Sequence, residues 1–289
     1  MNWQHLPEAI DPVIFTLGPL QLRWYGLMYL VAMLVVYLLA THRIKKENYP
    51  FDTEQLQNFL MWGFLGLLIG AKAGYILFYD FKDFLSDPLT HLLPFEFRDG
   101  FRFTGYSGMS YHGGLLGIII ASILYQRKHR QSMLVISDLV IPAIPLGYTF
   151  GRLGNFINGE LYGRATDVAW GMYFPADPQN KLRHPSQLYE AFGEGVLLFL
   201  ILWPLRKLLM KIPGLSIGVY IFGYGFVRFF IEFARQPDRH LGFVLGPFSM
   251  GQVLCFIMMF AGIGAALFFY WRAHRAIRGE KSKIRTGNC

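Results

Sequence analysis

The chain has 289 residues and a formal net charge of +8, and 53% of its residues are hydrophobic whereas only 16% are charged. A typical soluble domain carries about 25% charged residues, so this composition excludes an ordinary soluble globule. The apolar residues gather in runs of about 20, the length that an α-helix needs to cross the hydrocarbon core of a bilayer. The sequence therefore predicts an all-α polytopic membrane protein in contact with the lipid bilayer. The basic residues form no single patch, which argues against a nucleic-acid partner.

Seven apolar stretches predict seven transmembrane helices within a single membrane domain, 1–289. In chain order they cover about 22–41, 57–79, 109–126, 133–151, 187–205, 215–234 and 249–271. Lys and Arg are more numerous in the segments on the side of the C-terminal tail, so the positive-inside rule places the N-terminus outside and the C-terminus in the cytoplasm. The first 20 residues contain no Lys or Arg, and we therefore expect the first span to remain as an anchor.

Two predicted outer segments, 80–108 and 152–186, are much longer than ordinary connections between helices. They mix aromatic residues and Pro with polar residues, a composition that favours packing over disorder. We expect them to form a small folded cap on the outer face of the membrane.

The segment 151–164, which follows the fourth span, is rich in glycine. Glycine weakens a helix, so we expect an irregular loop folded into the outer mouth of the bundle. Arg152, Asn155 and Glu160 would offer polar side chains there to a ligand. The alternative is a purely structural re-entrant turn, which requires the glycines but not these three polar residues together.

Polar side chains also lie inside the sixth predicted span, at spacings of four, four and three that place them on one helical face. They are Tyr224, Arg228, Glu232 and Arg235. An ionisable group within a span is costly unless it is paired or faces water, so it marks a functional site by default. The alternative is an Arg228–Glu232 pair that only neutralises itself.

Two further residues near the outer ends of spans are candidates. His112 opens the third span beside Gly113 and Gly114, and a neutral imidazole there could accept a proton. The alternative for His112 is a packing role. Tyr25 lies at the start of the first span, where aromatic residues often belong to the interfacial belt.

Arginines within an apolar bundle suit a ligand with an anionic head and hydrocarbon tails, namely a phospholipid. Arg donates two parallel hydrogen bonds to a phosphate and stays charged when desolvated. The sequence shows no Ser-His-Asp order, nucleotide-binding loop or metal-ligand cluster, so we expect neither a cofactor nor a metal. The alternative to a lipid-modifying enzyme is a seven-span lipid or anion transporter, or a receptor.

Four blocks in order along the chain resemble the prolipoprotein diacylglyceryl transferase family. They are Tyr-His-Gly-Gly at 111–114, the pattern G-R-x-G-N-F-x-N-x-E-x-x-G at 151–163, Arg-His-Pro-Ser-Gln-Leu-Tyr-Glu at 183–190 and Arg-Phe-Phe-Ile-Glu-Phe-Ala-Arg-Gln-Pro-Asp at 228–238. The resemblance implies transfer of the diacylglyceryl group of phosphatidylglycerol to the lipobox cysteine thiol next to a prolipoprotein signal peptide. The products are a thioether and glycerol phosphate. This is the first step of bacterial lipoprotein maturation, at the outer face of the inner membrane.

The resemblance also implies roles for single residues. Arg152 and Arg228 would hold the lipid phosphate, and His112 occupies the position of the proposed base. Six further residues would support the phosphatidylglycerol site or fall on positions that the family uses: Asn155, Glu160, Tyr25, Tyr224, Glu232 and Gly163. A free thiol is a poor nucleophile at neutral pH, so some group must take its proton. The residues leave this acceptor open between His112, Tyr224 and the substrate phosphate.

Overall fold

The computed structural model describes residues 3–18, 20–92, 95–96, 102–103, 108–236 and 243–285. The chain divides into two compact units. The first combines Met1–Asn48 with Leu134–Cys289, and the second is Tyr49–Met133. The single membrane domain stays a prediction.

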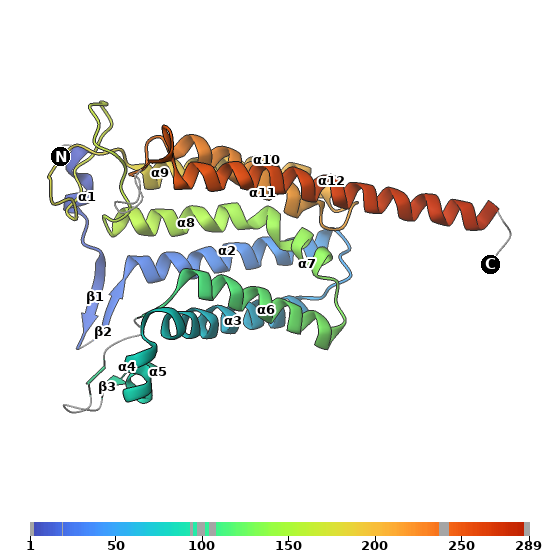
Figure 1. Cartoon of the computed structure of the whole chain (residues 1–289), viewed down its shortest axis with the longest axis horizontal. Coiled ribbons are helices and arrows are strands. Elements are labelled where there is room, and N and C mark those ends of the chain that lie inside the picture. Colours follow the sequence, from blue (N-terminus) through green and yellow to red (C-terminus); the bar gives the residue numbers. More distant parts are fainter. Residues whose placement is uncertain are drawn as a thin grey trace. The chain divides into compact units, whose positions relative to one another are not determined.

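The first unit begins with short elements that lead into a long helix. A 3-10 turn, η1 (Trp3–His5), and α1 (Leu6–Ala9) precede the antiparallel strands β1 (Val13–Leu17) and β2 (Leu20–Arg23), and α2 (Trp24–Lys46) follows directly. In Figure 1 the two strands run across the direction of α2. The chain thus turns sharply where its first long apolar helix starts.

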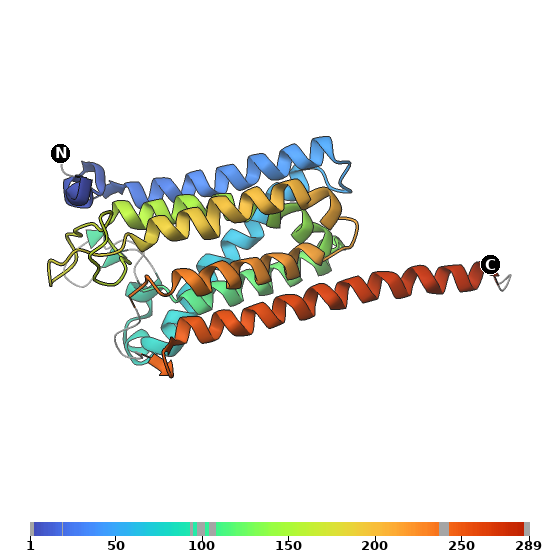
Figure 2. The same ribbon diagram turned by 90° about the horizontal axis from the view of Figure 1, so that it is seen from above.

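The rest of the first unit is helical apart from one short hairpin. Its elements are α7 (Met133–Val140), the 3-10 segment η2 (Ile141–Ala143), α8 (Ile144–Ile157), α9 (Ser186–Glu190), the π-helical segment η3 (Ala191–Leu197), α10 (Leu198–Leu209), α11 (Leu215–Ile231), β5 (Phe243–Leu245), β6 (Phe248–Ser249) and α12 (Met250–Arg285). Helix α8 packs against α2 and η3, and α11 runs beside α12 in both views (Figures 1 and 2).

A buried ion cluster joins the helix ends on one side of this unit. The Nε of Arg43, a fully buried residue, lies 2.8 Å from Glu47 Oε2, and the Nε of Arg206 lies 2.7 Å from Glu47 Oε1. Arg43 Nη1 also donates to the carbonyl of Asp138, whose carboxylate accepts from the backbone N–H of Gly214 before α11. Glu47 therefore links the C-terminal ends of α2 and α10, because it balances an arginine from each.

The second unit is built on two long helices. It contains α3 (Thr53–Tyr79), α4 (Phe81–Ser86), α5 (Pro88–Leu92), the strand pair β3 (Phe95–Glu96) and β4 (Arg102–Phe103), and α6 (Tyr111–His129). Glycines let α3 and α6 approach closely. A Cβ on Gly70 would lie 2.4 Å from the carbonyl oxygen of Gly113, and one on Gly117 would lie 1.9 Å from that of Gly66.

The helices support a polytopic membrane protein. Among the described residues, five helices are long and apolar enough to cross a membrane: Trp24–Glu47, Thr53–Tyr79, Met133–Ile157, Ser186–Leu209 and Met250–Arg275. Leu215–Ile231 is apolar but shorter. Seven spans, and the sidedness of the termini, stay predictions.

The prediction of an irregular loop over the glycine-rich segment 151–164 is wrong for its first half, because α8 continues to Ile157 and only the remainder is irregular. The missing side chain of Gly154 lets α8 approach α2, since a Cβ there would lie 3.1 Å from the Tyr25 ring. A helix also satisfies its backbone hydrogen bonds internally, which an apolar surrounding requires. The predicted outer segment 152–186 accordingly begins with the last turns of a helix.

Candidate functional site

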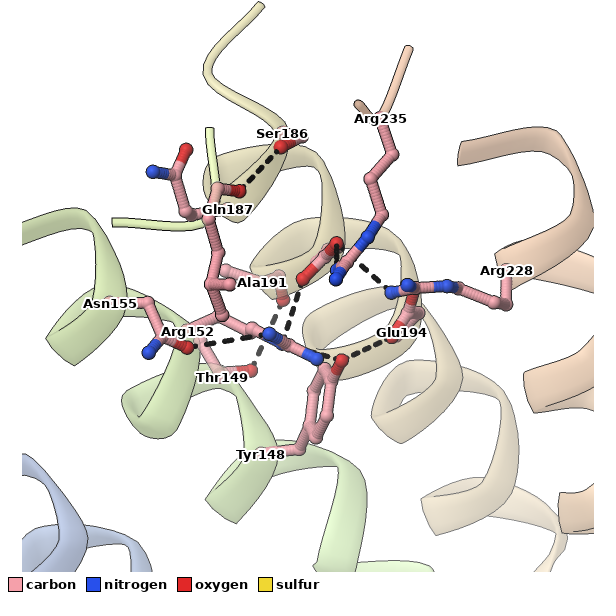
Figure 3. A network of polar contacts seen from close by, with 12 residues as sticks. Tyr148, Thr149, Arg152, Asn155, Ser186, Gln187, Ala191, Glu194, Arg228 and Arg235 are labelled. Carbon is pink, nitrogen blue, oxygen red and sulfur yellow. Dashed lines mark hydrogen bonds and ion pairs between the residues drawn. The ribbon is translucent and has the colours of Figure 1, made fainter. Parts of the chain in front are cut away.

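Three arginines meet at one buried carboxylate. Glu190, at the end of α9, has no exposed surface. Its Oε2 lies 2.8 Å from Arg152 Nε, and its Oε1 lies 2.9 Å from both Arg228 Nη1 and Arg235 Nη1. The arginines come from α8, from α11 and from the segment after α11, and Figure 3 shows the three side chains converging. The structure therefore brings the two arginines of the predicted phosphate site together.

A second carboxylate and a tyrosine extend this cluster. Glu194 is also fully buried, and its Oε1 lies 3.2 Å from Arg228 Nη1. The hydroxyl of Tyr148 donates to Glu194 and accepts from Arg152 Nε at 2.6 Å (Figure 3). The rings of Tyr148 and Tyr224 meet edge to face at 6.0 Å, so Tyr224 lies beside the same cluster.

Polar side chains continue from Arg152 toward the end of α8. Arg152 Nη1 donates to Asn155 Oδ1 at 3.4 Å, and Asn155 Nδ2 donates to Glu160 Oε1 at 2.8 Å. Tyr25 of α2 packs against Gly154, which precedes Asn155 in α8, and the Tyr25 hydroxyl lies 3.0 Å from the hydroxyl of Tyr29. Asn155 thus connects the arginine cluster to Glu160.

Glu232 contacts two of the three arginines, Arg228 and Arg235. Its Oε2 lies 3.3 Å from Arg228 Nη2 and 4.0 Å from Arg235 Nε, and its Oε1 accepts from the Ser249 hydroxyl at 3.1 Å. A Cβ on Gly251 would lie 2.4 Å from Glu232 Oε1, so this glycine makes room for the carboxylate. Arg228 therefore contacts three carboxylates, and the self-contained Arg228–Glu232 pair weighed from the sequence is wrong.

The π-helical segment Ala191–Leu197 explains why helices distant in sequence converge here. A Cβ on Gly195 would lie 2.1 Å from Thr149 Oγ1 in α8, and one on Gly193 would lie 2.8 Å from Val227 Cγ1 in α11. Two glycines on this one segment thus allow α8 and α11 to approach from either side. Such π-bulges often occur at functional sites.

Gly163 has a packing role in the structure. It forms a bridge with Arg235, and its N–H donates to the His184 carbonyl at 2.8 Å. A Cβ there would lie 2.3 Å from the Ala234 carbonyl oxygen. Burial, with a further contribution from Arg164, lowers the pKa of His184 and favours its neutral form. Gly163 thus lets the segment after α8 lie against the segment after α11.

The segment that leads from α8 to α9 is folded. Phe156, Met172 and Phe174 form a small hydrophobic core. Arg183 donates to both carboxylate oxygens of Asp177, at 2.7 and 2.8 Å, and these bonds lower the pKa of Asp177 to about 2. This segment is thus folded, whereas a cap built from it and from 80–108 on the outer face stays a prediction.

His112 lies in the first turn of α6, in the second unit. The hydroxyl oxygen of Ser110 caps this helix by accepting from the N–H of Gly113 at 3.3 Å. The arginine cluster lies in the first unit, whereas His112 belongs to the second. Its role as the base stays a prediction.

The sequence analysis did not find the centre of the site. Glu190, Glu194 and Tyr148 lie within apolar helices and contact the arginines, yet none was carried forward as a predicted site residue, although Glu190 stood out as an ionisable residue inside a span. The signal was present, because Glu190 and Glu194 are ionisable residues four apart in an apolar run, and this spacing places them on one helical face.

Among the described residues, no group of His, Cys, Asp and Glu is arranged to hold a metal ion.

The fold and this cluster define a class of protein: a polytopic membrane protein with a buried cluster of arginines and carboxylates. A family model described as prolipoprotein diacylglyceryl transferase matches residues 12–269. The chain therefore belongs to this family, and it is a membrane transferase of lipoprotein biosynthesis.

Individual relatives agree with the family match. The chain is 57% identical over 275 residues to the phosphatidylglycerol–prolipoprotein diacylglyceryl transferase of Chlorobaculum tepidum, and the match covers 95% of each chain. It is 49% identical over 259 residues to the enzyme of the same name from Pseudoalteromonas atlantica, covering 88% of this chain and 87% of the relative. The Vibrio vulnificus enzyme is 46% identical over 276 residues, covering 95% and 97%.

Proposed function

We propose that Arg152 and Arg228 bind the phosphate of phosphatidylglycerol while its diacylglyceryl group passes to the lipobox cysteine thiol of a prolipoprotein. One observation carries this assignment: the two guanidinium groups, from helices far apart in sequence, contact opposite oxygens of the Glu190 carboxylate at 2.8 and 2.9 Å. This shared contact holds two permanent positive charges at the spacing of one anionic group. Paired guanidinium groups suit a phosphate, which accepts several charge-assisted hydrogen bonds at once.

The contacts of the remaining nitrogens suggest where the phosphate binds. Arg152 Nη1 reaches Asn155 only at 3.4 Å, and Arg228 Nη2 reaches Glu232 only at 3.3 Å. These long contacts are weaker than those to Glu190 and are more easily exchanged. A phosphate can therefore take over these two nitrogens while Glu190 keeps both arginines in place.

The chemistry then follows from charge. The cysteine sulfur attacks the glycerol carbon that bears the phosphate, a C–S bond forms, and the C–O bond breaks with its electron pair going to the phosphate oxygen. Glycerol phosphate leaves with more negative charge than the diester carried, and the two arginines stabilise that charge as it develops. The proton of the thiol passes to His112, to Tyr224 ionised under the influence of the arginines, or to the leaving phosphate.

We place this site toward the outer face of the bacterial inner membrane, in a chain that spans the membrane seven times. The cluster lies at the end of α8 and α11 that is remote from the basic ends of α2, α10 and α12 (Figure 1). Basic ends favour the cytoplasm, which supports an outer location for the arginines. Tyr25, Asn155, Glu160 and Glu232 belong to the same end, and we infer that they support the phosphate position.

The test is transfer by arginine variants. We expect Arg152→Lys and Arg228→Ala each to abolish or nearly abolish transfer while the protein still inserts, because neither variant retains the paired fork at the phosphate. Mass spectrometry of a lipobox peptide incubated with the purified protein and phosphatidylglycerol measures the product. Arg206→Lys is the matched control, since it alters a partly buried arginine on Glu47 at the other end of the unit. Near wild-type transfer by either site variant would remove the phosphate role of the arginines.

A further inference from the structure

The hairpin of β1 and β2 has one apolar face that the described residues of the first unit leave exposed. Phe15 pairs with Leu22 across the two strands, and Leu17 lies two residues further along β1 on the same side. Their exposed fractions are 55% for Phe15, 43% for Leu22 and 69% for Leu17. A soluble surface rarely keeps several large apolar side chains together in contact with water.

The opposite face of the hairpin is polar. Thr16 pairs with Gln21, and the Gln21 side chain accepts from Arg23 Nη2 at 3.0 Å. Apolar and polar residues alternate regularly along β2, so the hairpin is amphipathic, as expected of a strand pair that lies between water and an apolar medium. Between Asp11 and Glu47 the sequence holds no Asp or Glu, which makes this boundary compatible with anionic headgroups.

The position of the hairpin identifies what covers its apolar face. Strand β2 ends at Arg23, and the candidate span Trp24–Glu47 begins at the next residue. That span exposes apolar side chains of its own, including Leu30 and Leu34. Because the strands run across the direction of α2, the hairpin lies along the plane of the membrane surface when α2 crosses the membrane (Figure 1).

We propose that the β1–β2 hairpin is an interfacial anchor, which inserts Phe15, Leu17 and Leu22 into the lipid at the membrane surface and keeps Thr16 and Gln21 toward water. Its partner is the bilayer and not a second protein. The anchor continues the lipid-facing surface of α2, and Arg23 lies where it can meet lipid phosphates. This inference does not depend on the chemistry proposed for the arginine cluster.

Site-directed spin labelling tests this arrangement in the full-length protein. Single cysteines are introduced by Phe15→Cys, Leu17→Cys and Leu22→Cys on the apolar face, with Thr16→Cys and Gln21→Cys as matched controls on the polar face. Cys255 and Cys289 are first replaced. The labelled proteins are reconstituted into vesicles of phosphatidylethanolamine and phosphatidylglycerol. Collision with oxygen, which dissolves in lipid, is then compared with collision with a water-soluble nickel chelate.

The three outcomes separate the possible environments. The anchor predicts that labels on the apolar face collide mainly with oxygen, whereas labels at Thr16 and Gln21 collide mainly with the nickel chelate. Frequent collision with nickel on both faces means that the hairpin stands in water and overturns the proposal. Rare collision with both reagents on the apolar face means that protein covers it, either another part of this chain or a bound peptide, and overturns the proposal as well.

Discussion

Replacing Glu190 by Gln isolates the contribution of the shared carboxylate. The substitution keeps the size of the side chain and one acceptor oxygen, but it removes the charge that three arginines contact at 2.8 to 2.9 Å. Losing one charge-assisted bond that positions a guanidinium group costs roughly 2 to 3 kcal/mol, which corresponds to about a 100-fold decrease in kcat. The KM for phosphatidylglycerol should stay the same or fall, because the arginines are then less neutralised when the anionic lipid arrives.

The assay follows thioether formation on a lipobox peptide at varied concentrations of phosphatidylglycerol, together with the thermal unfolding of each variant. Glu47→Gln is the matched control, because Glu47 is likewise buried and bridges two arginines, Arg43 and Arg206. We expect both variants to lose thermal stability but only Glu190→Gln to change kcat. A Glu190→Gln enzyme with unchanged kcat, or with kcat and lipid affinity reduced in proportion to stability, would refute the positioning role.

Three further outcomes are expected. His112→Asn should lower kcat more than it weakens phosphatidylglycerol binding; equal losses, measured by turnover and by lipid binding, would indicate packing instead. Because its folded-state pKa is lowered from 3.8 to about 2, Asp177 stabilises the fold fully above about pH 4 and loses this contribution as the pH falls toward 2. Asp177→Asn should therefore cost about 2 kcal/mol at neutral pH and flatten the acid side of a plot of Tm against pH; an unchanged plot counts against the Arg183 pair. Gly163→Ala places a Cβ 2.3 Å from the Ala234 carbonyl and should lower stability by about 1 to 3 kcal/mol, so a wild-type Tm would contradict that close contact.

Hydropathy predicted where apolar helices lie, but the ends of those helices depend on other interactions. Helix α3 starts at Thr53, before the predicted residue 57, because Asp52 and Gln55 form a capping box that begins the helix ahead of its apolar run. Helix α12 continues to Arg285, beyond the predicted end of the span at residue 271. An apolar run thus predicts the part of a helix that can cross lipid, whereas caps and polar turns set where the helix begins and ends.

The site was predicted in part, for a physical reason. The rule that an ionisable residue in a span needs a partner correctly drew attention to Arg228, but it does not say which residue that partner is. Glu190 and Glu194 lie more than 30 positions from Arg228, and only the packing of η3 between α8 and α11 brings them together. The glycine-rich segment shows the converse error, since Gly154 serves close packing against Tyr25 and not a break in the helix.

The π-helical segment between Glu190 and α10 makes the site sensitive to the length of the chain. A π-bulge holds one more residue than the α-helical turn it replaces, so removing a single residue from Ala191–Leu197 would restore regular α geometry. The flanking residues would keep nearly the same relative orientation, because seven π-helical residues turn the chain about as far as six α-helical ones, but the wide turn itself would be lost. The close contacts of Gly193 with Val227 and of Gly195 with Thr149 depend on that wide turn, so the residue count of this turn is as much a part of the site as the charges themselves.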